Sequence, residues 1–141
     1  GDPTPPAALL TTLLDSLLAT GKIDARKVYI GGLSLGGMGT FYMISTHPNL
    51  FAAAFPICGA GNVAEAGRFA KKVPVWIFHG GADKPEGDRA GMMNFMNCAQ
   101  PRKEVKYQEF AGVDHVGSWE KVYDDPTLMA QVVAWLLTFT K

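Results

Sequence analysis

Apolar residues recur along this chain at two spacings, one typical of amphipathic helices and one typical of buried strands. Near the N-terminus, leucines at helical spacing predict a helix over residues 6–20 with one apolar face that needs a sheet to cover. That face is made by Leu9, Leu10, Leu13, Leu14, Leu17 and Leu18. Short β-branched and aromatic runs predict strands at 28–30, 52–57, 73–79 and 105–110. The segments after them predict helices at 36–46, 63–70, 88–97 and 126–140.

Strands that alternate with helices predict an α/β fold, here a four-stranded parallel sheet with helices on both faces. The chain has 141 residues and 48% hydrophobic content, which is enough for one buried core. No internal repeat, low-complexity tract or second domain is present in the sequence. Residues 1–141 are therefore predicted to form a single domain.

The most informative motif follows the first predicted strand, where residues 32–36 read Gly-Leu-Ser-Leu-Gly. A strand, a tight turn and a helix make a nucleophile elbow, which holds the central residue, Ser34, in a strained conformation. Gly32 and Gly36 lack the Cβ atoms that would collide where strand and helix approach each other. The N–H of Leu35, at the start of the helix, then faces the position of a tetrahedral oxyanion. The motif alone is weak evidence, because serine-glycine turns are common in a chain with 16 glycines.

An acid and a histidine follow the serine, each after a predicted strand. Asp83 comes after an apolar run that ends at Gly80 and Gly81, and His115 lies in a glycine-containing loop after the last strand. Both positions are at the carboxyl edge of a parallel sheet, where ligands bind in α/β folds. The alternative for Asp83 is a turn residue that caps the helix starting near residue 86.

The chain has 3 histidines, and two of them compete with His115 for the role of general base. His47 precedes a proline at the end of a predicted helix, where it is expected to interact with the last carbonyls. His79 ends a strand near the site but precedes Asp83, which is the reverse of the required order. Trp119 follows His115 closely, and it either walls the substrate pocket or anchors its loop.

Several segments together resemble one known family. They are residues 23–40, His47-Pro48, 55–59, 79–83, 112–115 and Ser118-Trp119. Over nearly the whole chain this combination resembles bacterial secreted esterases and predicted peptidases of the α/β-hydrolase superfamily. The branch is the one related to prolyl oligopeptidases, feruloyl esterases and polyhydroxybutyrate depolymerases. The resemblance implies Ser34 as nucleophile, Asp83 as acid and His115 as base, and it implies a secreted or periplasmic bacterial protein.

The resemblance also predicts that this chain is only the C-terminal half of a hydrolase. A complete relative has further strands before the nucleophile strand, and a loop there donates the second oxyanion N–H. One side of the strand at 28–30 is then expected to be unpaired. This predicts a homodimer, or association with an N-terminal half, that buries more than about 1,000 Å².

The predicted reaction is hydrolysis of small-molecule carboxylic esters through an acyl-enzyme. Esters are favoured over amides because alkoxides leave more easily than amines. Two alternatives stay open. One is a non-catalytic or weakly active fragment that serves as a binding or structural module, since losing one oxyanion donor costs about 100- to 1,000-fold in rate. The other is a serine peptidase.

Composition argues against other partners. The chain has 13 Lys and Arg against 13 Asp and Glu, without a basic stripe, so nucleic acid is not an expected partner. No apolar run of about 18 residues is present, so no membrane span is expected. Residues 37–39 read Gly-Met-Gly, like the start of a dinucleotide-binding loop, but Tyr42 stands where that loop needs its third glycine. A dinucleotide is therefore not an expected ligand.

No cofactor or metal is expected, because Cys58, His79, Asp83 and His115 are not spaced as a compact ligand set. The 2 cysteines of the chain are Cys58 and Cys98. Two buried thiols are the favoured interpretation, and a disulfide in an exported protein is the alternative.

Overall fold

The computed structural model describes residues 5–83 and 104–141. Their strands form a 4-stranded sheet in the order β1-β2-β3-β4, and every neighbouring pair is parallel. The strands are β1 (Tyr29–Leu33), β2 (Ala53–Ile57), β3 (Val75–Gly80) and β4 (Val105–Phe110). The predicted four-stranded parallel sheet is confirmed. The helix predicted at 88–97, and Cys98, lie outside the described residues.

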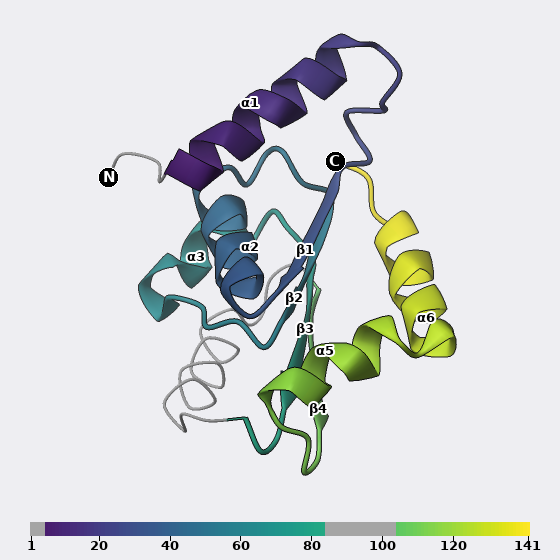
Figure 1. The fold of residues 1–141 in the computed structure, drawn as a ribbon. Coiled ribbons are helices and arrows are strands. Elements are labelled where there is room, and N and C mark those ends of the chain that lie inside the picture. The colour runs from purple at the N-terminus through teal and green to yellow at the C-terminus, as the bar shows by residue number, and fades with distance from the viewer. Residues whose placement is uncertain (1–4, 84–103) are drawn as a thin grey trace.

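Helices cover both faces of the sheet, as predicted. Figure 1 shows α1, α2 and α3 on one side, and α5 and α6 on the other. The helical elements are α1 (Pro5–Ala19), α2 (Leu35–Thr46), the 3₁₀ turn η1 (Val63–Glu65), α3 (Ala66–Phe69), α5 (His115–Tyr123) and α6 (Pro126–Leu137). The segment predicted as one helix at 63–70 is thus a 3₁₀ turn followed by a short α-helix.

Two apolar clusters hold these layers together, one on each face. On one face, Phe41 and Ile44 of α2 and Phe69 of α3 belong to a cluster that includes Ile77 of β3. On the other face, the cluster joins Trp76 and Phe78 of β3 to residues of α5 and α6, including Val122, Val132 and Trp135. Successive residues of a strand point to opposite faces, so β3 contributes to both clusters and every one of its residues is buried.

The expectation of a loop around His115 was wrong, because α5 begins there. Asp114 caps this helix, and its side chain accepts a hydrogen bond from the backbone N–H of Gly117 at 2.8 Å. Gly117 therefore lies inside the first turn, although its residue type suggested a loop. The helix fixes the position of His115 by its cap.

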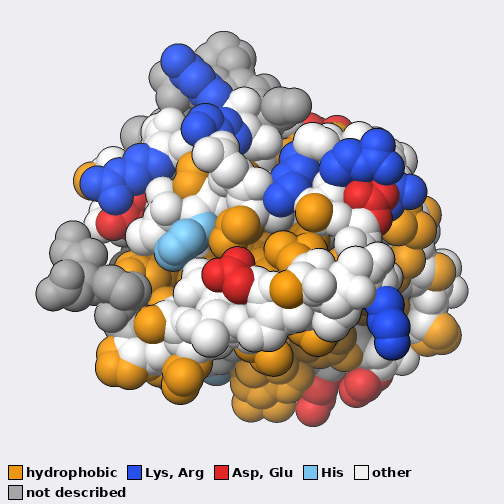
Figure 2. All heavy atoms as spheres, turned by 90° about the horizontal axis from the view of Figure 1, so that it is seen from above, with side chains coloured by type: hydrophobic (Ala, Val, Ile, Leu, Met, Phe, Trp, Pro, Cys, Tyr) orange, Lys and Arg blue, Asp and Glu red, His pale blue; other side chains and the backbone are white. Residues whose placement is uncertain are grey.

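The leucine face predicted for α1 is mostly exposed. Leu9 is 71% exposed and Leu13 is 55% exposed, and Ala7 is the residue of α1 that is buried. The helix is present as predicted, but the sheet does not extend beneath most of its apolar face. Seen from above, the molecule exposes hydrophobic side chains between separated Lys and Arg side chains (Figure 2).

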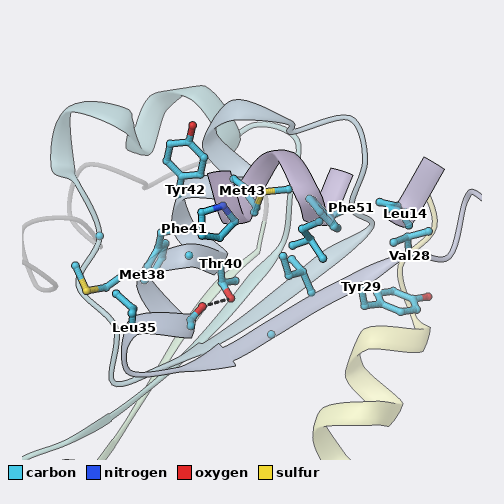
Figure 3. A pocket seen from close by; sticks show the side chains of 18 of the residues that line it. Leu14, Val28, Tyr29, Leu35, Met38, Thr40, Phe41, Tyr42, Met43 and Phe51 are labelled. Atoms are coloured by element: carbon cyan, nitrogen blue, oxygen red, sulfur yellow. Dashed lines mark hydrogen bonds between the residues drawn. The ribbon is translucent and has the colours of Figure 1, made fainter. Parts of the chain in front are cut away.

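An apolar groove of about 1120 Å³ lies between α1, β1 and α2. Leu14 of α1, Val28 next to β1, and Met38 and Phe41 of α2 are among the residues that line it (Figure 3). In the described sheet, β1 pairs with β2 alone and is an edge strand. We call this groove and the free side of β1 the open edge.

Candidate active site

Four side chains with reactive or ligating atoms gather at the carboxyl ends of the strands. Ser34 follows β1 and Cys58 follows β2 directly, Asp83 comes shortly after β3, and His115 comes shortly after β4. Because all neighbouring strands are parallel, these ends lie along one edge of the sheet. Ligands bind at this edge in α/β folds.

Ser34 occupies the strained turn that the sequence predicts. Its φ is 52° and its ψ is −117°, a conformation that residues other than glycine rarely adopt. Its N–H donates to Ile57 O at 2.9 Å, which ties the turn to the end of β2. A Cβ atom on Gly32 would lie 2.5 Å from Gly36 O, so this close approach requires glycine at position 32. The same requirement was expected of Gly36 and is wrong, since a Cβ there would meet nothing within 4 Å.

A line of hydrogen bonds joins the serine, the histidine and the aspartate. Ser34 Oγ lies 2.8 Å from His115 Nε2, and His115 Nδ1 lies 2.8 Å from Asp83 Oδ2. An ionised carboxylate only accepts, so Nδ1 carries the proton and Nε2 is left to accept from the serine hydroxyl. The side chain of Asp83 is 5% exposed, whereas that of His115 is 43% exposed and reachable from solvent.

Backbone contacts between two loops hold Asp83 and His115 in register. Gly81 N–H donates to Phe110 O and Ala82 N–H donates to Val113 O, both at 2.9 Å. A Cβ on Gly80 would lie 2.5 Å from the Ser118 Oγ of α5, so glycine at the end of β3 allows this packing. The relative placement of Asp83 and His115 therefore depends on these backbone contacts as well as on the hydrogen bond between the two side chains.

The two other histidines have different surroundings. His47 ends α2, where its N–H donates to Met43 O at 2.8 Å, which confirms its predicted place at a helix terminus. His79 is 1% exposed and its Nδ1 is 3.0 Å from Gly80 O, so this nitrogen donates. Its Nε2 lies 3.8 Å from Asp83 Oδ2. His79 is close to the site, as expected, but it contacts Asp83 rather than Ser34.

Leu35 and Trp119 flank the line of hydrogen bonds. Leu35 is the first residue of α2, so its N–H has no acceptor within the helix, while its side chain is 78% exposed. The ring of Trp119 meets the His115 ring edge-on, with centroids 5.3 Å apart. Trp119 also packs against the apolar cluster beneath α5 and α6, so it touches both the imidazole and the core.

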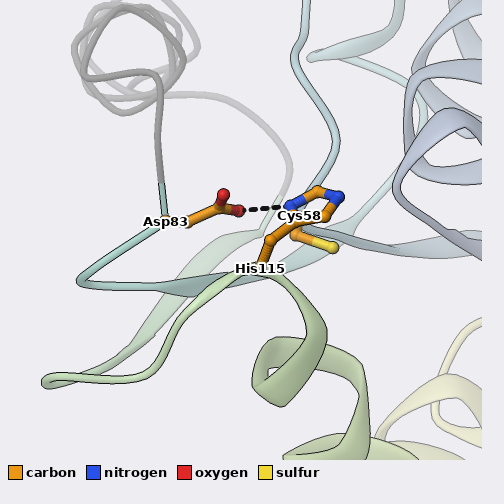
Figure 4. Close-up of side chains that lie close together, drawn as sticks. All are labelled: Cys58, Asp83 and His115. Atoms are coloured by element: carbon orange, nitrogen blue, oxygen red, sulfur yellow. Dashed lines mark hydrogen bonds and ion pairs between the residues drawn. The ribbon is translucent and has the colours of Figure 1, made fainter.

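Cys58 is the member of the site that sequence reasoning set aside. Its thiol lies beside Asp83 and His115, and one ligand atom from each of the three residues lies within 4.8 Å of the others (Figure 4). The expectation that these residues are not a compact set was therefore wrong for these three. Each of the three follows a predicted parallel strand, and this shared position could have predicted the cluster although the residues are far apart in sequence. Burial raises the pKa of the Cys58 thiol to about 11, so the thiol is protonated near neutral pH.

Known proteins with similar sequences include acetylxylan esterases and a poly(3-hydroxyalkanoate) depolymerase. The chain is 34% identical over 74 residues to a bifunctional acetylxylan esterase/xylanase of Neocallimastix patriciarum, an alignment that covers 52% of the chain and 11% of that protein. It is 40% identical over 53 residues to poly(3-hydroxyalkanoate) depolymerase C of Paucimonas lemoignei, covering 38% and 13%. It is 32% identical over 99 residues to acetylxylan esterase A of Aspergillus oryzae, covering 70% and 28%. No family model matches the chain.

Solved structures give the same result for the whole described fold. A thermostable esterase superposes with a TM-score of 0.82 at 32% identity, over 99% of this chain and 38% of that one. The chain belongs to the α/β-hydrolase superfamily. SOBER1 of Arabidopsis thaliana superposes with a TM-score of 0.67 at 18% identity, over 94% of this chain and 61% of its own, which is a likeness of fold alone.

The chain spans between 11% and 28% of the length of the curated relatives named above. The activity of a whole hydrolase therefore comes to it only as a proposal. Within residues 5–83 and 104–141, the helices are all too short or too polar to cross a lipid bilayer.

Proposed function

We propose that this chain carries the catalytic centre of a serine hydrolase that cleaves carboxylic esters. The observation that supports the proposal most directly is the pair of hydrogen bonds from Ser34 Oγ to His115 Nε2 and from His115 Nδ1 to Asp83 Oδ2, each 2.8 Å long. The strained backbone of Ser34 adds to it, because strain at a turn persists only where the surrounding structure holds it.

In the proposed reaction, Ser34 Oγ attacks the ester carbonyl carbon while His115 Nε2 takes the hydroxyl proton. Asp83 stabilises the imidazolium and keeps the proton on Nδ1. The carbonyl oxygen becomes an oxyanion that accepts a hydrogen bond from Leu35 N–H. His115 then returns the proton to the leaving alkoxide, which departs as an alcohol. Water attacks the acyl-enzyme by the same route, releasing the acid and restoring Ser34.

The names of the relatives favour esters over peptides as substrates. Two are acetylxylan esterases or contain one, and one is a poly(3-hydroxyalkanoate) depolymerase. All three names describe ester bonds on a polymer. We therefore propose a small acyl ester as the substrate class, with acetylated xylan and a poly(3-hydroxyalkanoate) as the two polymers to compare. Trp119, edge-on to the base, is the proposed wall of the pocket.

A weakly active or non-catalytic module is the second candidate. The observation behind it is that Leu35 N–H is the one oxyanion donor we assign, and a missing second donor costs about 100- to 1,000-fold in rate. The open edge, beside β1 and α2, is where further hydrolase chain is proposed to pack. We propose that a second copy of this chain or an N-terminal half covers it.

The test is hydrolysis of p-nitrophenyl acetate by the purified chain beside its Ser34→Ala variant. We expect turnover in the first that falls to background in the second, and covalent labelling of Ser34 by a fluorophosphonate. Thr40→Ala, elsewhere on α2, is the matched loss of a hydroxyl and should keep both signals. Turnover that persists in Ser34→Ala would reject the proposed nucleophile. Absence of both turnover and labelling in the parent chain would favour the module.

A further inference from the structure

We propose that Cys58, Asp83 and His115 form a binding site for a thiophilic divalent cation, such as Zn²⁺ or Cd²⁺, and that occupation of this site blocks hydrolysis. The three residues supply a sulfur, an oxygen and a nitrogen whose ligand atoms all lie within 4.8 Å of one another. Cation binding does not depend on the proposed function, whereas the inhibition rests on it.

The spacing suits a small tetrahedral cation. Zinc binds sulfur at about 2.3 Å, and nitrogen or carboxylate oxygen at about 2.0–2.2 Å. Ligand atoms around such an ion are roughly 3–4 Å apart at those bond lengths. The ligand atoms of the present cluster lie within 4.8 Å of one another, so they must approach by at most about 1–2 Å to reach this geometry.

The backbone that carries these ligands is held by other contacts, so the ion does not have to assemble the site. Cys58 N–H donates to Phe78 O at 2.8 Å, and Ala82 N–H, next to Asp83, donates to Val113 O at 2.9 Å. His115 begins the capped helix α5. Cys58 and Asp83 are buried and His115 is partly exposed, so the cation is expected to enter from the side of the imidazole.

The donor set selects the kind of cation. Mg²⁺ and Ca²⁺ prefer sites made of oxygen alone, whereas thiolate and imidazole favour zinc and its softer relatives. Binding converts the thiol to a thiolate and releases its proton to solvent. The thiolate and the Asp83 carboxylate then balance the two positive charges of the ion.

A cation bound to either ring nitrogen of His115 prevents this residue from acting as the proposed base. An ion on Nδ1 replaces the proton that His115 donates to Asp83, and the remaining proton on Nε2 then faces Ser34. An ion on Nε2 takes the lone pair that accepts the serine proton, 2.8 Å from Oγ. In both cases Ser34 has no base, so inhibition by the ion is reversible by a chelator.

The experiment titrates the whole chain with Co²⁺ and Cd²⁺ and follows thiolate-to-metal charge-transfer absorption. Because the chain has 2 cysteines, Cys98→Ser is the matched control for Cys58→Ser. We expect one equivalent of metal to produce the band in the parent chain and in Cys98→Ser, and no band in Cys58→Ser. Cys58→Ala is a second variant, and thermal melts check that each variant is folded.

The same samples are assayed with p-nitrophenyl acetate, each relative to its own metal-free rate. We expect Cys58→Ser to raise the Cd²⁺ concentration for half-inhibition at least about 10-fold, and EDTA to restore the parent rate. A band that survives in both Cys58 variants, or that disappears in Cys98→Ser, would overturn the site. Inhibition equal in the parent chain and the Cys58 variants would overturn the block. A parent chain without esterase activity would contradict the proposed function, while the absorption titration would still decide the metal site.

Discussion

The carboxyl edge of the sheet and the open edge differ in how completely their side chains are paired with other residues. At the carboxyl edge of the sheet, Ser34 and Asp83 each hydrogen-bond to His115, and backbone hydrogen bonds join the loops that carry these residues. At the open edge, by contrast, Leu13 of α1 is 55% exposed and the groove beside β1 is apolar. The carboxyl edge is built by contacts among the four described strands, whereas the open edge offers apolar surface without a partner in the described residues.

The comparison shows that the arrangement of the proposed triad does not depend on the apolar surface of the open edge. Each residue of the proposed triad lies after a strand or at the start of a capped helix, so the geometry of the triad depends on the sheet. The apolar face of α1 makes no such contribution, because most of its leucines are exposed. Changes at the first edge should therefore alter chemistry, and changes at the second should alter association.

The largest effect is expected for Asp83→Asn. An asparagine amide does not stabilise the imidazolium and favours the wrong tautomer of His115, so kcat should fall about 10⁴-fold. The measurement is the steady-state rate with p-nitrophenyl acetate. Asp24→Asn is the control, because this carboxylate is paired with Arg26 at 3.0 Å on the surface. A loss of less than 10-fold in Asp83→Asn would contradict the role of Asp83.

The next effect concerns the thiol at the same edge. Burial raises the pKa of Cys58 from 9.0 to about 11, so the thiolate fraction near neutral pH should be about 100-fold lower than for an ordinary cysteine. Alkylation by iodoacetamide should therefore be slow in the folded chain and should accelerate with pH up to about 11. Mass spectrometry of the Cys58 peptide gives the rate. Denatured protein is the control, and equal rates in the two states would contradict the burial of this thiol.

The sequence predicted those parts of the fold and site that depend on local pattern. The strand at 105–110 is found as β4 with the same bounds, and the elbow at Ser34 has its predicted backbone strain. Helix α5 was missed altogether because Gly112 and Gly117 suggested a loop. The cap at Asp114, with Trp119 and Val122 three residues apart in a helical pattern, was the signal available.

Two other features depend on tertiary contacts that local pattern does not encode. Cys58 was set aside because it is far from Asp83 and His115 in sequence, yet parallel strands bring their carboxyl ends together. The leucines of α1 have helical spacing whether or not anything packs against them. Their exposure follows from where the sheet ends, which the helix sequence does not specify.

A smaller effect is expected at the elbow for Gly32→Ala. The added methyl would lie 2.5 Å from Gly36 O, a backbone atom, so overpacking should lower the free energy of unfolding by about 1–3 kcal/mol. Gly36→Ala is the matched control, since its Cβ meets nothing within 4 Å and a helical alanine is favoured over glycine. Denaturant unfolding measures both variants. Equal stabilities for the two would show that the close approach is not needed.

The smallest change in the fold itself is expected for Leu13→Gln at the open edge. Because Leu13 is 55% exposed, the free energy of unfolding of the monomer should change by no more than about 0.5 kcal/mol. Association should change much more if a second copy covers the groove. The parent chain should then sediment as a dimer that buries more than about 1,000 Å², and the variant should shift toward monomer.

Ile44→Ala is the contrasting variant, since Ile44 is fully buried and its truncation should lower the free energy of unfolding by about 2–5 kcal/mol without altering association directly. A parent chain that sediments as a monomer at high concentration, with Leu13→Gln unchanged, would reject the second copy. An N-terminal half supplied separately would then remain as the proposed partner, and it should bind the parent chain more tightly than the variant.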